Sequence, residues 1–196
     1  MGRPRTIADE RLLGAAGAVI GRRGPAFTLA DVAAEAGVAA GTLVARFGSK
    51  RGLLTALSRW SSVRTVAAMR SAAASRRTGS AALRAALVAA AADLEDPAAA
   101  ANHLAQLGVD RGDPELRRAL LAGQRAVAAE LRRLVRGASD LPRAPSPGRA
   151  AGALLALWNG TLLSWSLDPR GPLAGRLHRA ADVLLAAWRA DPRETR

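Results

Sequence analysis

Three side chains between residues 28 and 50 have the types and spacing that contact with a nucleic acid requires. Thr42 can donate a hydrogen bond to a phosphate or a base edge. Arg46, four residues later, carries a fork of donors that suits a guanine edge or a phosphate. Lys50, a further four residues on, can reach a backbone phosphate. Such contacts require secondary-structure elements that hold the three side chains in position.

Two short helices around a tight turn are predicted to position them. Thr28 can cap a first helix, and Asp31 can answer it from the third position. Gly37 ends this helix as a left-handed stop. A second helix is predicted over about residues 40–46, with Leu43 facing inward. A helix, a turn containing glycine and a second helix form a helix-turn-helix, whose second helix enters a major groove about 12 Å wide.

The segment resembles the TetR family of bacterial repressors. The matching residues run from Thr28 to Val38 and continue as Gly41-Thr42-Leu43, Phe47-Gly48-Ser49-Lys50 and Leu53-Leu54. The resemblance covers about residues 11–57 and is carried further along the chain only by the helical layout. Three positions depart from the family pattern. The family usually has serine or threonine where Ala39 stands, tyrosine where Val44 stands, and tyrosine or histidine where Arg46 stands.

The resemblance and the helix-turn-helix pattern together imply a set of residues that contact double-stranded DNA. The N-terminal basic residues join the set because family members often place a basic arm near the backbone or minor groove, whose negative potential suits arginine. The candidates are Arg3, Arg5, Thr28, Ala39, Ala40, Gly41, Thr42, Val44, Ala45, Arg46 and Lys50.

The composition favours a polyanionic partner without locating its site. The 196-residue chain has a formal net charge of +13, and residues 1–54 account for only a small part of it. An alternative function is therefore a basic protein that binds DNA without regard to sequence. The longest apolar runs are shorter than the roughly 20 residues of a membrane span, and no secretory signal is recognisable. We expect a cytoplasmic protein with no membrane partner.

The residue types offer little support for catalysis or for a metal site. The chain contains no cysteine, and only His103 and His178 could supply imidazole, so neither a metal site nor a cofactor is expected. His178 and Asp182 are four apart on a predicted helix, and Ser164 could complete a triad, but no nucleophile elbow surrounds this serine. A helical enzyme using His103 or His178 is the least favoured alternative, and we expect no enzyme.

The periodicity is helical nearly throughout, which predicts an all-α fold of about nine helices. Residues 1–57 would form the DNA-binding domain, and residues 58–196 a larger helical domain for ligand binding and dimerisation. Within the larger domain, one helix is expected from Thr78 to about Leu94. Two last helices are expected at about 147–166 and 172–190.

The larger domain is predicted to bind a small apolar effector and to pair two subunits. Ligand pockets are mostly apolar with few polar groups. The predicted pocket residues are Leu83, Leu87, Leu104, Leu107, Leu120, Trp158, Asn159 and Leu162. In the resembled family the last two long helices form a four-helix bundle between subunits. The dimer-interface candidates are Leu155, Trp165, Leu177, Leu184 and Trp188.

Overall fold

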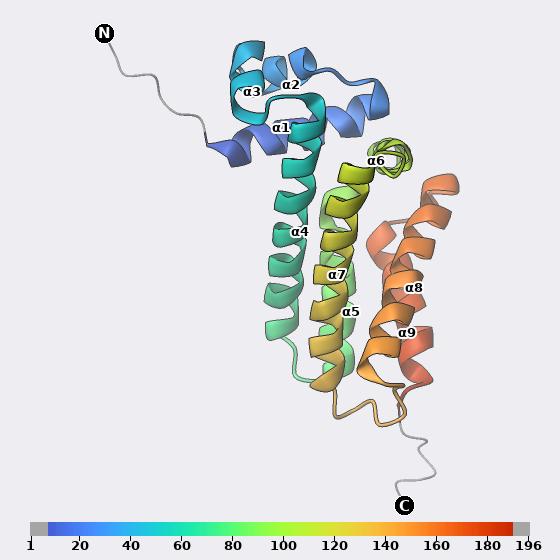
Figure 1. The fold of residues 1–196 in the computed structure, drawn as a ribbon. Helices are drawn as coiled ribbons and strands as arrows, with labels where there is room; N and C mark the ends of the chain where they lie inside the picture. The colour runs from blue at the N-terminus through green and yellow to red at the C-terminus, as the bar shows by residue number, and fades with distance from the viewer. Residues whose placement is uncertain (1–7, 190–196) are drawn as a thin grey trace, which may run out of the picture. The chain divides into compact units, whose positions relative to one another are not determined.

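The computed structural model describes residues 8–189, which contain nine α-helices, two short 3-10 helices and no strand (Figure 1). This confirms the predicted all-α class. The α-helices are α1 (Asp9–Arg23), α2 (Leu29–Ala36), α3 (Ala40–Phe47), α4 (Lys50–Ala74), α5 (Gly79–Ala89), α6 (Pro97–Asp110), α7 (Pro114–Arg136), α8 (Pro147–Leu167) and α9 (Leu173–Ala186). The 3-10 helices are η1 (Gly24–Ala26) and η2 (Ala92–Leu94).

The chain packs as two compact units. Unit 1 comprises residues 1–61 and 98–122, and unit 2 comprises residues 62–97 and 123–196. Helix α4 therefore begins in unit 1 and continues in unit 2. These units group residues by packing, and the functional boundary expected after residue 57 stays a prediction.

Local signals in the sequence account for the helix ends of unit 1. The Thr28 hydroxyl accepts the Asp31 amide, and the Asp31 carboxylate accepts the Thr28 amide, so α2 begins with a capping box. At its other end, Gly37 is left-handed with φ 66°. The amides of Val38 and Gly37 bond back to Ala33 and Ala34, which is a Schellman motif. The short helix α2 is therefore fixed at both ends.

One apolar core holds α1, α2, α3 and the start of α4 together. Each large side chain buried this fully contributes about 1.5–3 kcal/mol by removing apolar surface from water. The largest are Leu12, Ile20, Phe27, Leu43 and Leu53. Helix α6 of the same unit packs on the end of α1, where the Asn102 amide donates to the Gly21 carbonyl at 2.8 Å. The two helices of the motif are thus held by a core that they share with α1 and the start of α4.

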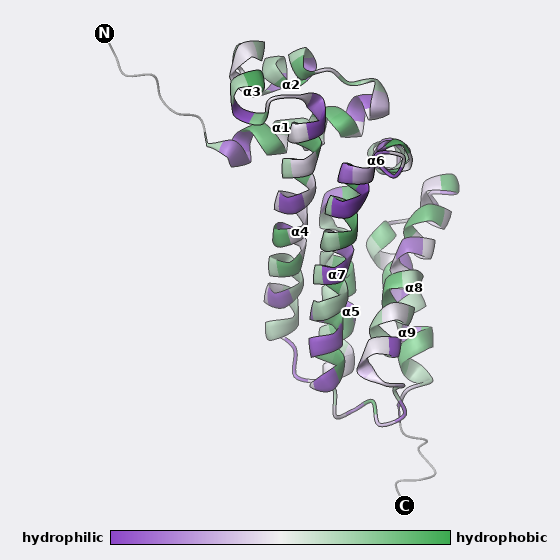
Figure 2. Ribbon diagram, in the orientation of Figure 1, coloured by the Kyte–Doolittle hydropathy of each residue, from purple (hydrophilic) through white to green (hydrophobic). Residues whose placement is uncertain are grey.

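Unit 2 has its own core, built from the rest of α4 with α5, α7, α8 and α9. Figure 2 shows hydrophilic and hydrophobic residues alternating along α7, whose apolar stripe includes the buried Leu131 and Leu134. Glu130 is also buried on this helix, where the guanidinium groups of Arg70 and Arg133 hold it. Their hydrogen bonds satisfy a carboxylate that would otherwise be costly to bury.

Two helices end earlier than their periodicity predicts. Helix α5 stops at Ala89 instead of continuing to about Leu94. Three carboxylates follow within seven residues, and negative charge is unfavourable at a helix C-terminus. Helix α9 stops at Ala186 instead of residue 190, since the Trp188 carbonyl accepts the Arg143 amide at 3.0 Å in a tertiary bond.

Helix α8 is the one described helix long and apolar enough to cross a membrane. Length and composition alone give this result, and core helices of soluble proteins share both properties. Its buried residues include Ala150, Leu154 and Trp165, which belong to the packing of unit 2.

Candidate DNA-binding site

Helix α3 presents one buried side chain and an open outer face. Leu43 is completely buried in the core of unit 1, and Phe47, four residues later, packs against the same core. The outer positions Ala40, Gly41 and Ala45 are exposed, and a Cβ added at Gly41 would meet no atom within 4 Å. Small side chains on an open face let a helix lie close to another surface. This is the geometry that the predicted reading helix requires.

The first turn of α3 leaves backbone amides available. Ala39 occupies the N-cap position and has no side chain able to accept a hydrogen bond. Its carbonyl accepts the Thr42 amide at 2.9 Å, which closes the first helical turn. The amides ahead of Thr42 have no intrahelical partner, and such groups favour phosphate oxygens.

The turn from α3 into α4 depends on two glycines. Gly48 has φ 74° and ψ −48°, and the amides of Ser49 and Gly48 bond to Phe47 and Val44 respectively. This tight γ-turn suits glycine, because side chains at positive φ are strained. A Cβ on Gly52 would lie only 2.0 Å from the Phe47 carbonyl oxygen. The glycines therefore let α4 start directly beneath the end of α3.

Lys50 connects the start of α4 to the segment between α1 and α2. Its ammonium donates to the carbonyls of Pro25 at 2.9 Å and Phe27 at 2.6 Å, and lies 3.9 Å from the centre of the Phe27 ring. Burial lowers the pKa of Lys50, while attraction to Asp110 and Asp31 opposes the shift. The residue fastens the segment between α1 and α2 onto the start of α4. Its predicted contact with a phosphate stays a prediction.

Arg46 lies on the last turn of α3 and contacts α1. Its guanidinium is 2.9 Å from the Asp9 carboxylate, and its side chain is 38% exposed. Because Asp9 is itself half-exposed, the pair is open to exchange with a phosphate or a base edge. Val44, where the resembled family usually has tyrosine, is 49% exposed on the same helix and brings an apolar surface to the open face.

The remaining DNA candidates have different surroundings. Thr42 is half-buried on α3. Thr28 is exposed, but its hydroxyl serves the capping box, and its backbone hydrogen bond is the largest factor lowering the pKa of Asp31. Arg3 and Arg5 lie outside the described residues. The structure therefore brings the candidates from Ala39 to Arg46 together on α3 and its N-cap, and it places Lys50 against the segment between α1 and α2.

The two histidines have different surroundings. His103 is half-buried on α6, where its Nε2 lies close to Gly21 of α1. His178 is 3.5 Å from Asp182 on α9, as their spacing predicts, and Asp182 also pairs with Arg84. Within residues 8–189, no cluster of three or more acidic or histidine side chains could hold a metal ion.

The predicted pocket residues are divided between the two units. Leu104, Leu107 and Leu120 belong to unit 1 and are half-buried. In unit 2, Leu83, Leu87 and Leu162 are buried, and the Trp158 indole donates to the Leu87 carbonyl at 3.1 Å. Asn159 is exposed on α8. That these residues line one cavity stays a prediction.

The side chains predicted at a dimer interface are buried or half-buried within one subunit, and their contact with a second subunit stays a prediction. Leu177 is fully buried, and Trp165 and Trp188 are 2% and 7% exposed. Leu155 and Leu184 pack partly buried against the same core. The large apolar side chains that α8 and α9 do expose are Leu163, Leu167 and Val183. Next to them, α8 and α9 form an open groove lined by Leu157, Gly160, Thr161, Ser164, Arg176, Arg179 and Ala180.

A helix-turn-helix with an open second helix in an all-α chain is the arrangement with which many DNA-binding regulators read a major groove. Residues 12–57 match the model of the bacterial regulatory proteins, tetR family. Over this segment the chain is similar to the tetR family. A comparison with curated proteins finds no match.

Solved structures of regulators share the fold over nearly the whole chain. PfmR, a TetR family regulator from Thermus thermophilus, is 22% identical with a TM-score of 0.69, over 92% of this chain and 100% of that chain. SmeT, the repressor of the Stenotrophomonas maltophilia multidrug efflux pump SmeDEF, is 23% identical with a TM-score of 0.68, over 95% and 93%. FadR from Bacillus subtilis, solved with stearoyl-CoA, is 19% identical with a TM-score of 0.73, over 92% and 99%.

Proposed function

We propose that this protein is a ligand-responsive homodimeric repressor that reads a palindromic operator with α3. The observation that carries the proposal is the open face of α3, formed by small residues beside the buried Leu43. A helix with such a face fits the major groove, and two copies related by a two-fold axis would bind half-sites about 34 Å apart, or a multiple of this.

Recognition would combine backbone positioning with a few base contacts. The uncapped amides at the start of α3 and the Thr42 hydroxyl would bind phosphates, which sets the register of the helix. Arg46 would exchange the Asp9 carboxylate for a guanine edge or a phosphate, at little cost because the pair is exposed. Val44 and Ala45 would meet the thymine methyl groups that apolar side chains recognise.

Dimerisation would use the outer face of α8 and α9. Leu163, Leu167 and Val183 are exposed there, and large apolar side chains gain the most when a partner removes them from water. Replacing Leu163 by glutamate should yield monomers in sedimentation equilibrium. Val63 on α4 is also exposed and provides a control, since a V63E variant should stay dimeric. Monomers of the wild-type chain would contradict the dimer.

The effector would be a small, mainly apolar molecule held between helices of the larger domain. FadR from Bacillus subtilis was solved with stearoyl-CoA, so this fold accommodates such a ligand in that protein. Binding to the arrangement with wrongly spaced reading helices would shift the population away from DNA. Long-chain acyl-CoA serves as the first probe, and release of the operator on its addition would identify the ligand class.

The operator is tested by selecting binding sites from a random-sequence duplex pool with the full chain. The proposal predicts an enriched palindrome whose half-sites have the spacing given above. Enrichment of no sequence, with affinity that falls steeply with salt, would instead favour the alternative of a basic protein that binds DNA without regard to sequence. Loss of some turnover on replacing His103 or His178, with DNA binding intact, would favour an enzyme.

A further inference from the structure

Exposed arginines are clustered at one end of unit 2, and none of them belongs to α3. Three segments meet there: residues 75–80 from the end of α4 into the start of α5, residues 133–149 from the last turn of α7 to the first turn of α8, and residues 187–189 after α9 (Figure 1). Hydrogen bonds join them, because the Arg143 amide donates to the Trp188 carbonyl and the Arg189 guanidinium donates to Ser80. We call this surface the basic end.

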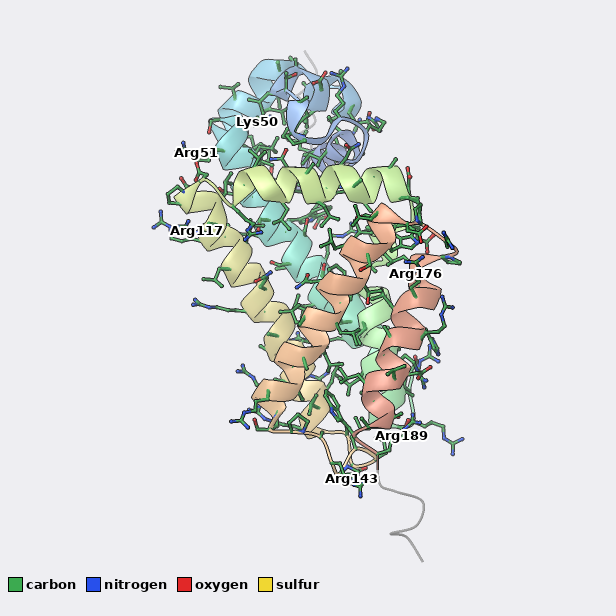
Figure 3. The ribbon with its side chains drawn as sticks, turned by 90° about the vertical axis from the view of Figure 1, so that its right-hand side faces the viewer. Lys50, Arg51, Arg117, Arg143, Arg176 and Arg189 are labelled. Carbon is green, nitrogen blue, oxygen red and sulfur yellow. The ribbon has the colours of Figure 1, made fainter. Side chains whose placement is uncertain are left out.

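The basic end has almost no negative charge of its own. Its arginines are all exposed, and they are Arg76, Arg77, Arg133, Arg136, Arg143, Arg149 and Arg189. Figure 3 shows two of them, Arg143 and Arg189, on the segments that meet there. The one acidic residue in these segments is Asp140. Such an imbalance creates a positive potential that attracts polyanions.

The carboxylate of Asp140 already accepts hydrogen bonds from the backbone. Its two carboxylate oxygens accept the Ser80 amide, each at 3.2 Å, so it caps the start of α5. Arg133 pairs with Glu130 of α7. By contrast, Arg76, Arg77 and Arg149 have no acidic partner within residues 8–189. Their charge is available to a partner.

The start of α8 adds positive potential to the same surface. No side chain caps this helix, because the Ser146 side chain makes no hydrogen bond to its first turn, and Pro147 occupies the first position. The amides of the first turn point outward with the positive end of a 21-residue helix dipole. The exposed Arg149 lies in that turn, so its side chain and the first-turn amides belong to the same helix end. These are two independent sources of affinity for phosphate.

The absence of an exposed apolar anchor selects among polyanions. Among the described residues of the basic end, the large apolar side chains are at most 8% exposed, and they are Leu134, Val135, Leu141 and Trp188. Apolar side chains that enter the lipid strengthen binding at a membrane surface, and a stable protein interface usually has an apolar centre. A nucleic-acid backbone requires neither of them, since neutralising phosphates and releasing counterions supply the free energy.

We propose that the basic end is a second DNA-binding surface, which contacts the phosphate backbone of duplex DNA without reading its sequence. It acts independently of α3 and would give the protein a hold on DNA outside its operator. It also gives a role to much of the positive charge that lies outside the helix-turn-helix.

The test separates this surface from the reading helix. An A45E variant places a carboxylate on the open face of α3 and serves as the background. In it, Arg76, Arg77 and Arg149 are replaced by glutamine. The matched control replaces three other exposed arginines on or next to α7, Arg111, Arg117 and Arg125, so that the net charge changes equally. Fluorescence anisotropy with a short duplex of random sequence is recorded across salt concentrations, and thermal unfolding verifies that each protein is folded.

The proposal predicts that A45E still binds the duplex at low salt. The R76Q/R77Q/R149Q set should lose about tenfold in affinity and should lower the slope of log affinity against log salt by about two to three, because each lost phosphate contact removes about 0.9. The control set should change the slope by less than about one. Equal losses in both sets, or no duplex binding by A45E, would overturn the proposal. So would a loss confined to binding of phosphatidylserine vesicles. Operator binding by the wild-type α3 would stand in any of these cases.

Discussion

The ammonium of Lys50 lies on two backbone carbonyls and beside an aromatic ring, although its position in the sequence suggests a phosphate contact. The spacing from Thr42 and Arg46 identifies the neighbourhood of this side chain, but it does not give its direction. Phe27 and Pro25 lie more than twenty residues earlier in the chain. Only the folded packing of α1 against α4 brings their carbonyls within reach.

Replacing Lys50 by methionine should therefore destabilise the protein as well as alter DNA binding. The variant leaves two carbonyls without their charged donor, and hydrogen bonds to charged groups contribute about 1.5–3 kcal/mol each before relaxation. We expect a loss of about 2 kcal/mol in urea unfolding. The neighbouring R51M variant removes an exposed pair with Asp113 and should cost less than about 1 kcal/mol. An unchanged stability in K50M would refute the structural role.

At Ala39 we expect a substitution to stabilise the protein, because this N-cap position lacks a side chain that can accept a hydrogen bond. Serine at this N-cap position can accept an amide of the first turn of α3, which contributes about 1 kcal/mol. An A39S variant should be more stable by about that amount in thermal unfolding. Serine one position later, in A40S, cannot cap and should give no gain. Equal effects of A39S and A40S would show that the N-cap is already satisfied.

At the scale of elements, the sequence predicts ends that have local causes. The capping box at Thr28 and the left-handed stop at Gly37 each involve residues within five positions, and the structure confirms both of them. Ends with distant causes are missed. Trp188 leaves the helical pattern to bond with Arg143, and no local signal near residue 188 predicts this contact.

The turn between α3 and α4 should tolerate no side chain at Gly52. A Cβ there would be 2.0 Å from the Phe47 carbonyl oxygen, so the backbone must move, at a cost of about 1–3 kcal/mol. Because the turn sets the direction of α3, G52A should also weaken operator binding. Gly17 in α1 is the control, since a Cβ there meets nothing within 4 Å and G17A should gain about 1 kcal/mol. Chemical denaturation and anisotropy measure the two effects.

The link between α4 and α7 predicts a pH dependence. Burial alone would raise the pKa of Glu130, but hydrogen bonds from Arg133 and Arg70 hold it below the ordinary 4.5. A lowered carboxyl pKa contributes stability that is present above pH 4.5 and is lost as the pH falls through the lowered value.

Replacing both arginines, in R70M/R133M, should cost about 3–5 kcal/mol at neutral pH, because the buried carboxylate loses its partners. The carboxyl pKa then rises, so the variant should become less stable as the pH increases through the ordinary glutamate range. Unfolding at several pH values checks the sign. The control R125M/R132M removes exposed arginines of the same helix and should leave the profile unchanged.

At the scale of the whole molecule, tertiary packing separates what the sequence predicts from what it leaves open. The all-α class and the reading helix follow from periodicity and from a contiguous motif. The dimer candidates Trp165, Leu177 and Trp188 are apolar and lie on the expected helices, yet their own subunit buries them. An apolar side chain on an amphipathic helix can face its own core or a second subunit, and periodicity gives the same signal for both. Only the folded structure distinguishes these buried residues from the exposed Leu163, Leu167 and Val183.

We propose above all that α3 is the element that reads DNA. The most direct measurement compares the affinity of the wild-type chain and A45E for the selected operator and for a random duplex, by anisotropy across salt concentrations. We predict that the wild-type chain binds the operator roughly a thousandfold more tightly than the random duplex, which is the lower end of the range for specific DNA-binding proteins. We also predict that A45E abolishes this preference. Equal affinity of the wild-type chain for both duplexes, or a preference that A45E leaves intact, would contradict the account.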